Sequence, residues 1–269
     1  MHALAAWRRL RSAAPAALVF VSALGAAGCQ PRPPRDGGAG EELGFAALID
    51  RIAPSVVNVT ISVSARGRRE GPWFRGAPDE GGPQRTSLGT GFLLDGAAHV
   101  VTNAHVVAGM DAPRLRVPGD AALYEGTVVA LDPRLDLAVI RVPGLLAPPI
   151  RFAERVAETG DSAVVAGFPG GGDLVAEPAR IRARVAARGE DIYGRSGVVR
   201  EVYAFRGNVV PGNSGGPLLA PNGRVLGVVF AAGLGTPDTG YAITAQQAQS
   251  MARQGIEATA PVDTGACRT

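Results

Sequence analysis

Apolar residues along this chain come in short blocks separated by glycine and proline, without long helical repeats. In residues 55–63 a β-branched residue stands at every second position, which is the pattern of a strand buried on one face. Similar blocks form two sets on either side of a proline-rich break at 143–149. The first set covers 91–94, 99–102, 115–117, 124–131 and 137–142, and the second covers 163–168, 179–187, 200–206, 217–219, 225–230 and 240–244. Many short strands joined by turns predict an all-β barrel or sandwich in two halves.

Two segments show helical spacing instead. Residues 41–52 place their apolar side chains roughly on one face, which predicts a short helix, and residues 245–254 predict a closing helix. Residues 66–83 are rich in glycine and proline and are interpreted as a long surface loop. Trp73 and Phe74 within this loop are expected to pack modestly against the barrel, the alternative being that they anchor a partner.

The first 28 residues have the layout of an export signal. Three arginines precede an uncharged apolar run at 13–27, and small residues follow before Cys29. We therefore expect an exported protein of the cell envelope or the medium, with a flexible tether at 29–42. The ending at 24–29 resembles a bacterial lipobox, with Ala26 where a larger aliphatic residue is more usual. A lipid on Cys29 and ordinary cleavage that leaves Cys29 free to pair both stay open.

Composition narrows the chemistry. The 269 residues are 46% hydrophobic, which is enough for one sizeable folded unit. The net charge of +3 equals the three arginines of the export signal, so charge alone does not favour nucleic acid or a membrane surface as a partner. The sequence has no lysine, which excludes a Ser-Lys dyad, a Walker-type phosphate loop and Schiff-base chemistry. With three histidines and no metal-binding spacing, a zinc site is not expected.

A serine lies among glycines at 212–217, Gly-Asn-Ser-Gly-Gly-Pro, within an apolar context rich in strands. Glycine there adds no side chain to a core, so the bare backbone must serve another purpose. We interpret it as an oxyanion hole formed by the N–H groups of Gly212 and Ser214. Taken alone, the six residues would also fit an ordinary turn between strands.

A histidine and an aspartate complete the candidate chemistry. His105 follows an apolar strand and Asp136 begins another, so the chain order is His105, Asp136, Ser214. A nucleophilic serine needs a base to take its proton, and the base needs a carboxylate to orient it. Asp132 precedes a proline in a turn, where aspartate has a local structural role, and His99 is interpreted as a strand residue.

These motifs resemble those of the bacterial chymotrypsin-like (trypsin-like) serine peptidases, which include the HtrA group. The matching motifs are at 89–92, 102–107, 136–139 and 212–217. Further segments resemble the protease domain of a mycobacterial periplasmic branch associated with acid resistance, namely 167–172, 178–182, 191–194, 225–230 and 264–267. The resemblance covers about 86–267 and implies two perpendicular six-stranded antiparallel β-barrels with the catalytic triad in the cleft between them. On this basis the protease domain is placed at 43–269, with barrel one at about 52–143 and barrel two at about 150–245.

The resemblance also implies a mechanism and a substrate class. Ser214 would attack a peptide carbonyl, His105 would transfer the proton and Asp136 would orient His105, with no metal or organic cofactor. The partners would be protein or peptide substrates, and the resemblance to the acid-resistance branch would imply proteolysis during envelope stress or acid resistance. The base of the specificity pocket would come from Asn208 and its walls from 228–233, which include Val228 and Phe230. No acid stands at that base, so a small or medium apolar residue is expected before the cleaved bond.

The chain departs from the related proteins in three places. It has an export signal and tether where that branch has several membrane helices, so lipid would be the route of any membrane attachment. Between Cys29 and Cys267 it has no cysteine, so Cys267 would pair with Cys29, pair between chains or stay free. About 55 residues follow Ser214, too few for the last strands and a PDZ domain.

Two other classes compete with a peptidase. One is a catalytically silent protein-binding module on the same double barrel, with the triad present but misaligned. The other is an α/β-hydrolase esterase, which would need Gly-x-Ser-x-Gly with histidine last in the chain; neither feature occurs here.

Overall fold

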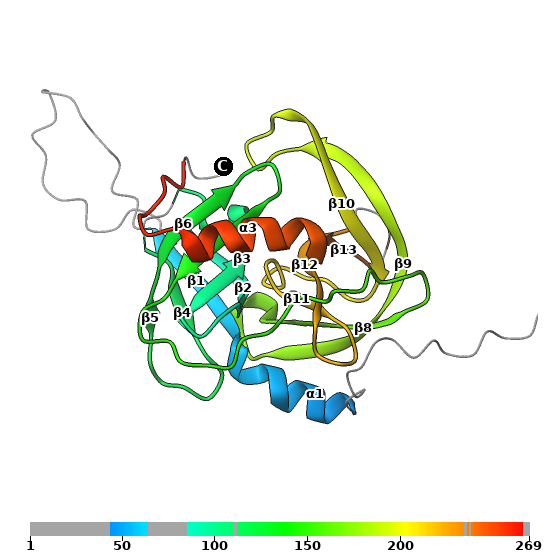
Figure 1. Cartoon of the computed structure of the whole chain (residues 1–269), viewed down its shortest axis with the longest axis horizontal. Helices are drawn as coiled ribbons and strands as arrows, with labels where there is room; N and C mark the ends of the chain where they lie inside the picture. Colours follow the sequence, from blue (N-terminus) through cyan, green and yellow to red (C-terminus); the bar gives the residue numbers. More distant parts are fainter. Residues whose placement is uncertain (1–43, 64–84, 110–111, 234–235, 237, 266–269) are drawn as a thin grey trace, which may run out of the picture. The chain divides into compact units, whose positions relative to one another are not determined.

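The computed structural model describes residues 44–63, 85–109, 112–233, 236 and 238–265, whose arrangement is drawn in Figure 1. The predicted export signal, the tether and the loop with Trp73 and Phe74 lie outside the described residues, as do Cys29 and Cys267. The expected N-terminal helix is present as α1 (Phe45–Ile52), followed by the 3₁₀ turn η1 (Ala53–Ser55). None of the helices in the described ranges is long and apolar enough to cross a membrane.

An antiparallel sheet forms the first half, with seven strands in the order β5-β4-β1-β2-β3-β7-β6. The strands are β1 (Val56–Val63), β2 (Arg85–Leu93), β3 (His99–Thr102), β4 (Arg114–Arg116), β5 (Tyr124–Glu125), β6 (Thr127–Asp132) and β7 (Leu137–Arg141). A one-turn helix, α2 (Ala104–Val107), follows β3 directly.

The two outer strands of this sheet, β5 and β6, are one stretch of chain interrupted at Gly126. β5 pairs with β4 and β6 pairs with β7, so the sheet curls until its two edges are consecutive in sequence. The Gly126 N–H donates to the Pro113 carbonyl at 2.8 Å. A Cβ atom at Gly126 would lie 2.3 Å from Ile140 Cγ2, so any larger residue would force the bend or Ile140 to shift. If 124–132 is counted as one bent strand, this half has the six strands that were expected.

The second half is a closed six-stranded barrel in the order β10-β13-β12-β11-β8-β9, which confirms the predicted all-β, two-part fold. Its strands are β8 (Ser162–Gly167), β9 (Val175–Glu190), β10 (Ser196–Arg206), β11 (Pro217–Leu219), β12 (Val225–Ala232) and β13 (Thr239–Thr244). A 3₁₀ turn, η2 (Pro169–Gly171), follows β8. The closing helix α3 (Ala245–Glu257) extends three residues beyond the predicted end.

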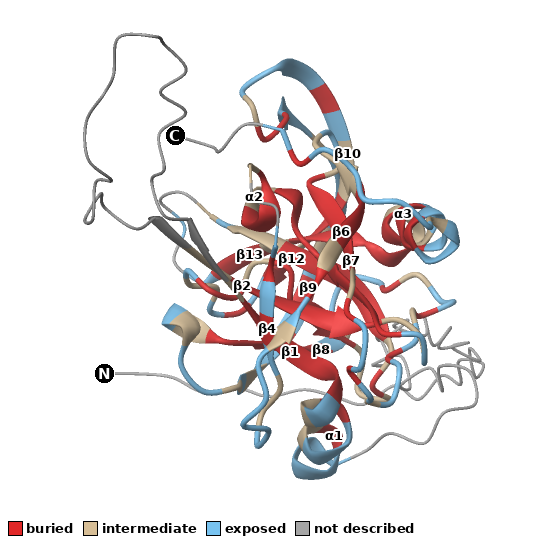
Figure 2. Cartoon of the chain, turned by 90° about the vertical axis from the view of Figure 1, so that its left-hand side faces the viewer, coloured by how far each residue is buried: buried red, intermediate tan, exposed pale blue. Residues whose placement is uncertain are grey.

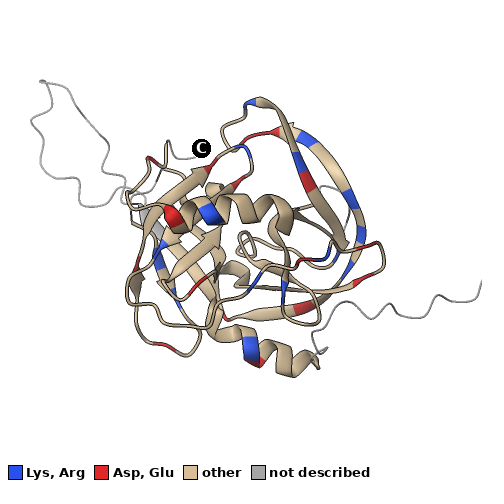
Figure 3. Cartoon of the chain, viewed as in Figure 1, with Lys and Arg blue, Asp and Glu red and all other residues tan. Residues whose placement is uncertain are grey.

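The hairpin of β9 and β10 is much longer than the sequence pattern predicted. Its outer part is largely exposed (Figure 2), and β9 carries arginines along its length (Figure 3). Its valines Val185 and Val199 are 40% and 45% exposed, so no buried face marks this part as a strand. Backbone pairing and surface ion pairs such as Arg184 Nη2 to Glu201 Oε2, at 2.6 Å, hold it instead. The hairpin turn at 191–195 is thereby carried to the first half of the molecule.

One buried cluster joins the two halves. It combines Val139 of β7 with Val164 of β8, Val228 of β12 and Met251 of α3. Gly255 of α3 packs so closely on β7 that a Cβ atom there would lie 2.4 Å from Val139 Cβ. Each half also has its own interior cluster. Burial of apolar surface in the shared cluster fixes one half against the other, and residues from both halves can therefore form one site.

Candidate active site

His105 lies on α2, directly after the fully buried strand β3. Its ring Nδ1 lies 2.8 Å from Asp136 Oδ2 and 3.0 Å from Asp136 Oδ1. Its backbone N–H also donates to Asp136 Oδ1, at 2.9 Å. An ionised carboxylate only accepts hydrogen bonds, so Nδ1 carries the proton and Nε2 is left as the basic nitrogen. The imidazole is 22% exposed, whereas the carboxylate is 6% exposed.

Asp136 occupies a turn with a left-handed backbone, at φ 59°. Glycine is the residue that adopts this left-handed region most readily, but aspartate tolerates it better than most other residues do. The Asn103 side-chain amide donates to the Asp136 carbonyl at 2.7 Å, which ties this turn to the start of α2. Asn103 is fully buried, so the aspartate and the histidine are positioned by the same hydrogen-bonded unit.

The turn before Ser214 requires glycine. Gly212 has φ 102°, and a Cβ atom there would lie 2.2 Å from the Phe168 carbonyl oxygen. Gly215 has φ 86°, and a Cβ atom there would lie 2.1 Å from the Thr90 carbonyl oxygen. The bare backbone inferred from the sequence therefore allows close approach of chain to chain on both sides of the serine.

Carbonyl contacts orient the peptide groups around Ser214. The Pro211 carbonyl accepts from Gly170 N–H at 2.8 Å, and the Asn213 carbonyl accepts from Gly216 N–H at 3.0 Å. In a trans peptide the N–H points opposite to the C=O, so the N–H groups of Gly212 and Ser214 point away from these contacts. No carbonyl among the described residues accepts either N–H. Two free donors next to a serine are the feature that an oxyanion hole requires.

Ser214 lies against the segment that carries His105. A Cβ atom at Gly89 would lie 2.7 Å from Val106 Cγ1 and 3.1 Å from the Ser214 carbonyl oxygen, so α2 and the serine turn meet at this glycine. Thr90 N–H donates to the Ser214 carbonyl at 2.8 Å. Within the described part of the chain the Ser214 hydroxyl makes no hydrogen bond, either with His105 or with another group.

A pocket of about 570 Å³ opens beside His105 and Asp136. Its other walls come from the hairpin residues 190–194 and from Arg200, Phe230 and Ala231. Of the three residues predicted to bind substrate, the structure brings Phe230 to this pocket. Asn208 is exposed and lines a separate pocket with Phe45 and Leu48 of α1, and Val228 is fully buried in the core cluster between the halves.

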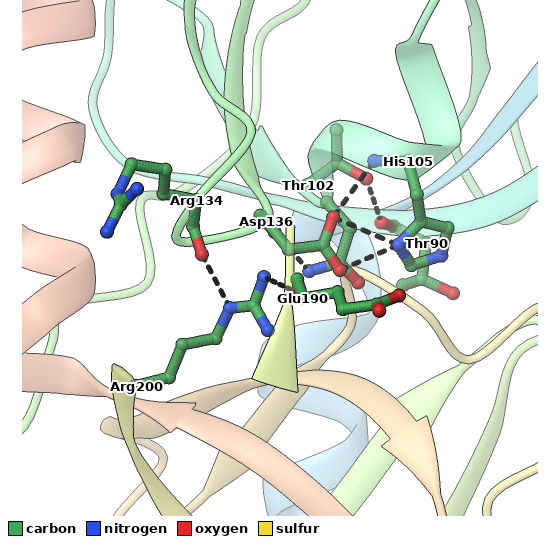
Figure 4. Close-up of polar contacts among 8 residues, drawn as sticks. Thr90, Thr102, His105, Arg134, Asp136, Glu190 and Arg200 are labelled. Atoms are coloured by element: carbon green, nitrogen blue, oxygen red, sulfur yellow. Dashed lines mark hydrogen bonds and ion pairs between the residues drawn. The ribbon is translucent and has the colours of Figure 1, made fainter. Parts of the chain in front are cut away.

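Arg200 of β10 connects the hairpin with the Asp136 turn, as Figure 4 shows. Its Nε donates to the Arg134 carbonyl at 2.6 Å and its Nη2 to the Glu190 carbonyl at 3.0 Å. Its guanidinium carbon lies 5.9 Å from the centre of the Phe230 ring. Burial lowers the pKa of Arg200, and the carboxylate of Asp136 opposes that shift. Arg200 thus places a half-buried positive charge behind the Asp136 turn.

The hairpin turn also packs against α2. Ile192 is buried with Ala104 and Ala108, on either side of His105 in the chain. Asp191 Oδ1 accepts the N–H groups of Tyr193 and Arg195, each at 2.9 Å. The hydrogen bond from Arg195 N–H is the main cause of a pKa of Asp191 below its ordinary value, and burial opposes it. The position of His105 therefore depends on contacts from both halves.

The two competing candidates have structural roles. Asp132 Oδ1 accepts the N–H groups of Arg134 and Leu135, at 2.8 and 2.9 Å, which is the turn-capping role expected for it. His99 is buried on β3, with its Nδ1 2.8 Å from Asp95 Oδ2.

Several residues around the site have no role that the sequence predicted. These residues make contacts that cross between the two halves or depend on turn geometry, and the local sequence does not predict such contacts. They are Arg200, Asn103 and Ile192. The turn motif 191–194 was noted only as part of a resemblance.

Comparison with known proteins gives consistent results. Residues 89–228 match the trypsin-like peptidase domain. The serine protease Rv3671c of Mycobacterium tuberculosis is 47% identical over 185 residues, covering 68% of this chain and 46% of that protein. A Pseudomonas putida protein named "Probable periplasmic serine endoprotease DegP-like" is 29% identical over 210 residues, covering 68% of this chain and 42% of its own length.

Among solved structures, the active form of the Rv3671c protease from M. tuberculosis is similar with a TM-score of 0.72 and 40% identity. The match covers 82% of this chain and 89% of that one. This chain therefore spans about half the length of the curated relatives it matches, and nearly all of a crystallised protease domain.

Proposed function

This chain belongs to the trypsin-like peptidase family, and from that premise we propose that it is a serine endopeptidase that hydrolyses peptide bonds through an acyl-enzyme. The observation that supports this most strongly is the pairing of His105 Nδ1 with both carboxylate oxygens of Asp136, at 2.8 and 3.0 Å. This pairing leaves Nε2 as the base, and the Ser214 turn packs beside α2 at Gly89.

In the proposed reaction, His105 Nε2 takes the proton from Ser214 Oγ as the oxygen attacks the carbonyl carbon of the substrate. Asp136 stabilises the imidazolium, and the N–H groups of Gly212 and Ser214 donate to the negative oxygen of the tetrahedral intermediate. His105 then gives its proton to the leaving amine. In the second half of the reaction, His105 takes a proton from a water molecule as the water attacks the ester of the acyl-enzyme. His105 then returns this proton to Ser214, and the acid product leaves. The hydrogen bond between a catalytic serine and its histidine often forms fully only when substrate is bound. This agrees with the Ser214 hydroxyl making no hydrogen bond among the described residues.

The pocket beside His105 is proposed to receive the substrate chain, with Phe230 as an apolar contact. The proposed specificity is for a small or medium apolar residue before the cleaved bond. The family resemblance is the only support for a substrate-binding role of Asn208 and Val228. Profiling cleavage of a mixed peptide library tests this specificity, since enrichment of charged residues before the cleaved bond would contradict it.

We propose that the protease acts in the cell envelope and that it degrades proteins there during envelope stress or acid stress. The export-signal pattern in the first 28 residues and the lipobox-like ending at Cys29 support this placement. Metabolic labelling with a fatty acid tests the lipid, because a Cys29→Ser variant should lose the label if Cys29 carries it.

The decisive experiment measures hydrolysis of an unfolded protein by the full chain and by Ser214→Ala. The variant should lose about 10⁵-fold or more in kcat, as the loss of one member of a triad does. A folded parent with no activity on proteins, peptides or esters would contradict the proposal, and the silent protein-binding module would then be the better account.

A further inference from the structure

Thr90 of β2 has all of its polar groups directed at the site, although the residue itself is fully buried. Its N–H donates to the Ser214 carbonyl at 2.8 Å. Its hydroxyl donates to the Gly212 carbonyl at 2.7 Å and accepts from Phe168 N–H at 3.0 Å. Its carbonyl accepts from the Thr102 hydroxyl at 2.7 Å. Thr90 belongs to the first half of the molecule, whereas Gly212, Ser214 and Phe168 belong to the second.

The hydroxyl of Thr90 is satisfied on both sides by backbone. It donates its one hydrogen to Gly212, and one of its lone pairs takes the Phe168 N–H. Both partner groups are buried away from water, and an unpaired buried backbone group is costly. The hydroxyl therefore has one favoured orientation, and that orientation fixes both partners.

These two partners lie on the two segments that build the oxyanion-binding turn. The Gly212 carbonyl sits between the two free donors, the N–H groups of Gly212 and Ser214. Phe168 begins the turn η2, in which Gly170 N–H holds the Pro211 carbonyl at 2.8 Å. Through one hydroxyl, Thr90 thus restrains the peptide on each side of Gly212, one directly and one through η2.

We propose that Thr90 is a positioning residue that holds the Gly212 and Ser214 amides in the orientation that binds the oxyanion. The inference rests on the proposed peptidase function and adds to it a specific residue of the opposite barrel. The family match begins at Gly89, next to Thr90, but it assigns no role to the hydroxyl.

The surroundings of Thr90 allow the hydroxyl to be tested with little change in shape. A Cβ atom at Gly216 would lie 3.2 Å from Thr90 Cγ2, so the methyl group fills space beside the serine turn. Valine keeps that methyl group and has a second methyl group in place of the hydroxyl. Serine keeps the hydroxyl and loses the methyl. The pair Thr90→Val and Thr90→Ser therefore separates hydrogen bonding from packing.

The test compares kcat and KM for peptide hydrolysis by the full chain. Thr90→Val should lower kcat about 10-fold to 100-fold, somewhat less than the loss of a whole oxyanion donor, with KM within about threefold of the parent. Thr90→Ser should retain kcat within about threefold. A peptide boronate, which mimics the tetrahedral intermediate, should bind Thr90→Val at least tenfold more weakly, while a product peptide should bind as it does to the parent.

Thr244→Val is the matched control, because Thr244 is also fully buried and its hydroxyl donates to Glu201 Oε1 at 3.1 Å, between β13 and β10 of barrel two. It should keep the kcat of the parent. If Thr90→Val does not fold, Thr90→Ala takes its place with the same kcat and boronate measurements.

Equal losses in Thr90→Val and Thr90→Ser would overturn the proposal, because packing would then be the cause. An unchanged kcat and boronate affinity in the folded variant without the hydroxyl would overturn it as well. An inactive parent would instead contradict the proposed peptidase function, so the two failures are distinguishable.

Discussion

His105 and Asp136 are held by side-chain hydrogen bonds, whereas the turn around Ser214 is held through its backbone carbonyls. In the first region the carboxylate of Asp136 accepts both the ring and the backbone N–H of His105. In the second region the carbonyls of Pro211, Gly212 and Asn213 each accept a hydrogen bond, whereas the N–H groups of Gly212 and Ser214 have no acceptor among the described residues. The acid and base thus depend on the chemistry of their own side chains, while the oxyanion site is built from backbone and depends on glycines that have no side chain.

The difference predicts how each region fails. A substitution at the acid or base should change the chemistry of the site and leave the fold intact. A substitution at the glycines should displace the backbone, with losses in both activity and stability. The following variants test that contrast.

The largest of these effects is expected for Asp136→Asn, about 10⁴-fold in kcat. The asparagine oxygen would accept the His105 backbone N–H in place of Oδ1, and its NH₂ group would face the ring Nδ1. That arrangement forces the imidazole tautomer with the proton on Nε2, which cannot take a proton from Ser214. Thermal unfolding should show a Tm close to that of the parent.

The matched control is Asp132→Asn, which removes a carboxylate from the same loop. Asparagine can still accept the N–H groups of Arg134 and Leu135, so kcat should stay within about threefold of the parent. Equal losses from the two variants would show that loop charge, and not the orientation of His105, controls the activity.

A smaller loss of kcat is expected for Gly212→Ala, about 10²-fold to 10³-fold, because the turn must move away from the Phe168 carbonyl. Gly223→Ala is the control, since Gly223 also has a positive φ, of 78°, but its Cβ would meet Leu48 Cδ1 at 3.3 Å, far less closely than Gly212 meets Phe168. Both variants should lower Tm, and kcat should fall only in the first. Full activity in Gly212→Ala would contradict the backbone account of the oxyanion site.

The smallest effect concerns the hairpin turn, through the pH dependence of stability. The folded state holds the pKa of Asp191 below its unfolded value of about 3.9, so its contribution is present above that pH and is lost as pH falls through the folded pKa. Asp191→Asn should therefore have a lower Tm than the parent at pH 7, and the difference should shrink as the pH falls below about 4. A constant difference over this range would exclude the charge of Asp191 as its cause.

The same contrast explains what the sequence could reveal. The serine turn was visible because glycine at positions that require positive φ leaves a mark in the sequence, as at Gly212 and Gly215. His105 and Asp136 could be selected by residue type and order, and the double barrel followed from short alternating strands. In the second half the pattern matched β8, β11, β12 and β13 well, because most residues of these strands are buried.

Other features left no local signal. The outer part of the β9–β10 hairpin buries little, so its strands were predicted too short. Residues 124–131 were predicted as one strand without the bend at Gly126, because a glycine within an apolar run does not indicate whether the chain turns there. Arg200 and Thr90 act on segments more than 60 residues away in sequence, and only the packed fold brings them there.

The central claim is that Ser214 is a nucleophile activated within an assembled site. Labelling of the full chain with a fluorophosphonate, located by mass spectrometry of the digested protein, tests it most directly. The account predicts a single adduct on the peptide that contains Ser214, absent in Ser214→Ala and slowed by several orders of magnitude in Asp136→Asn. Folded parent protein that gains no adduct, or gains it equally in Ser214→Ala, would contradict the account.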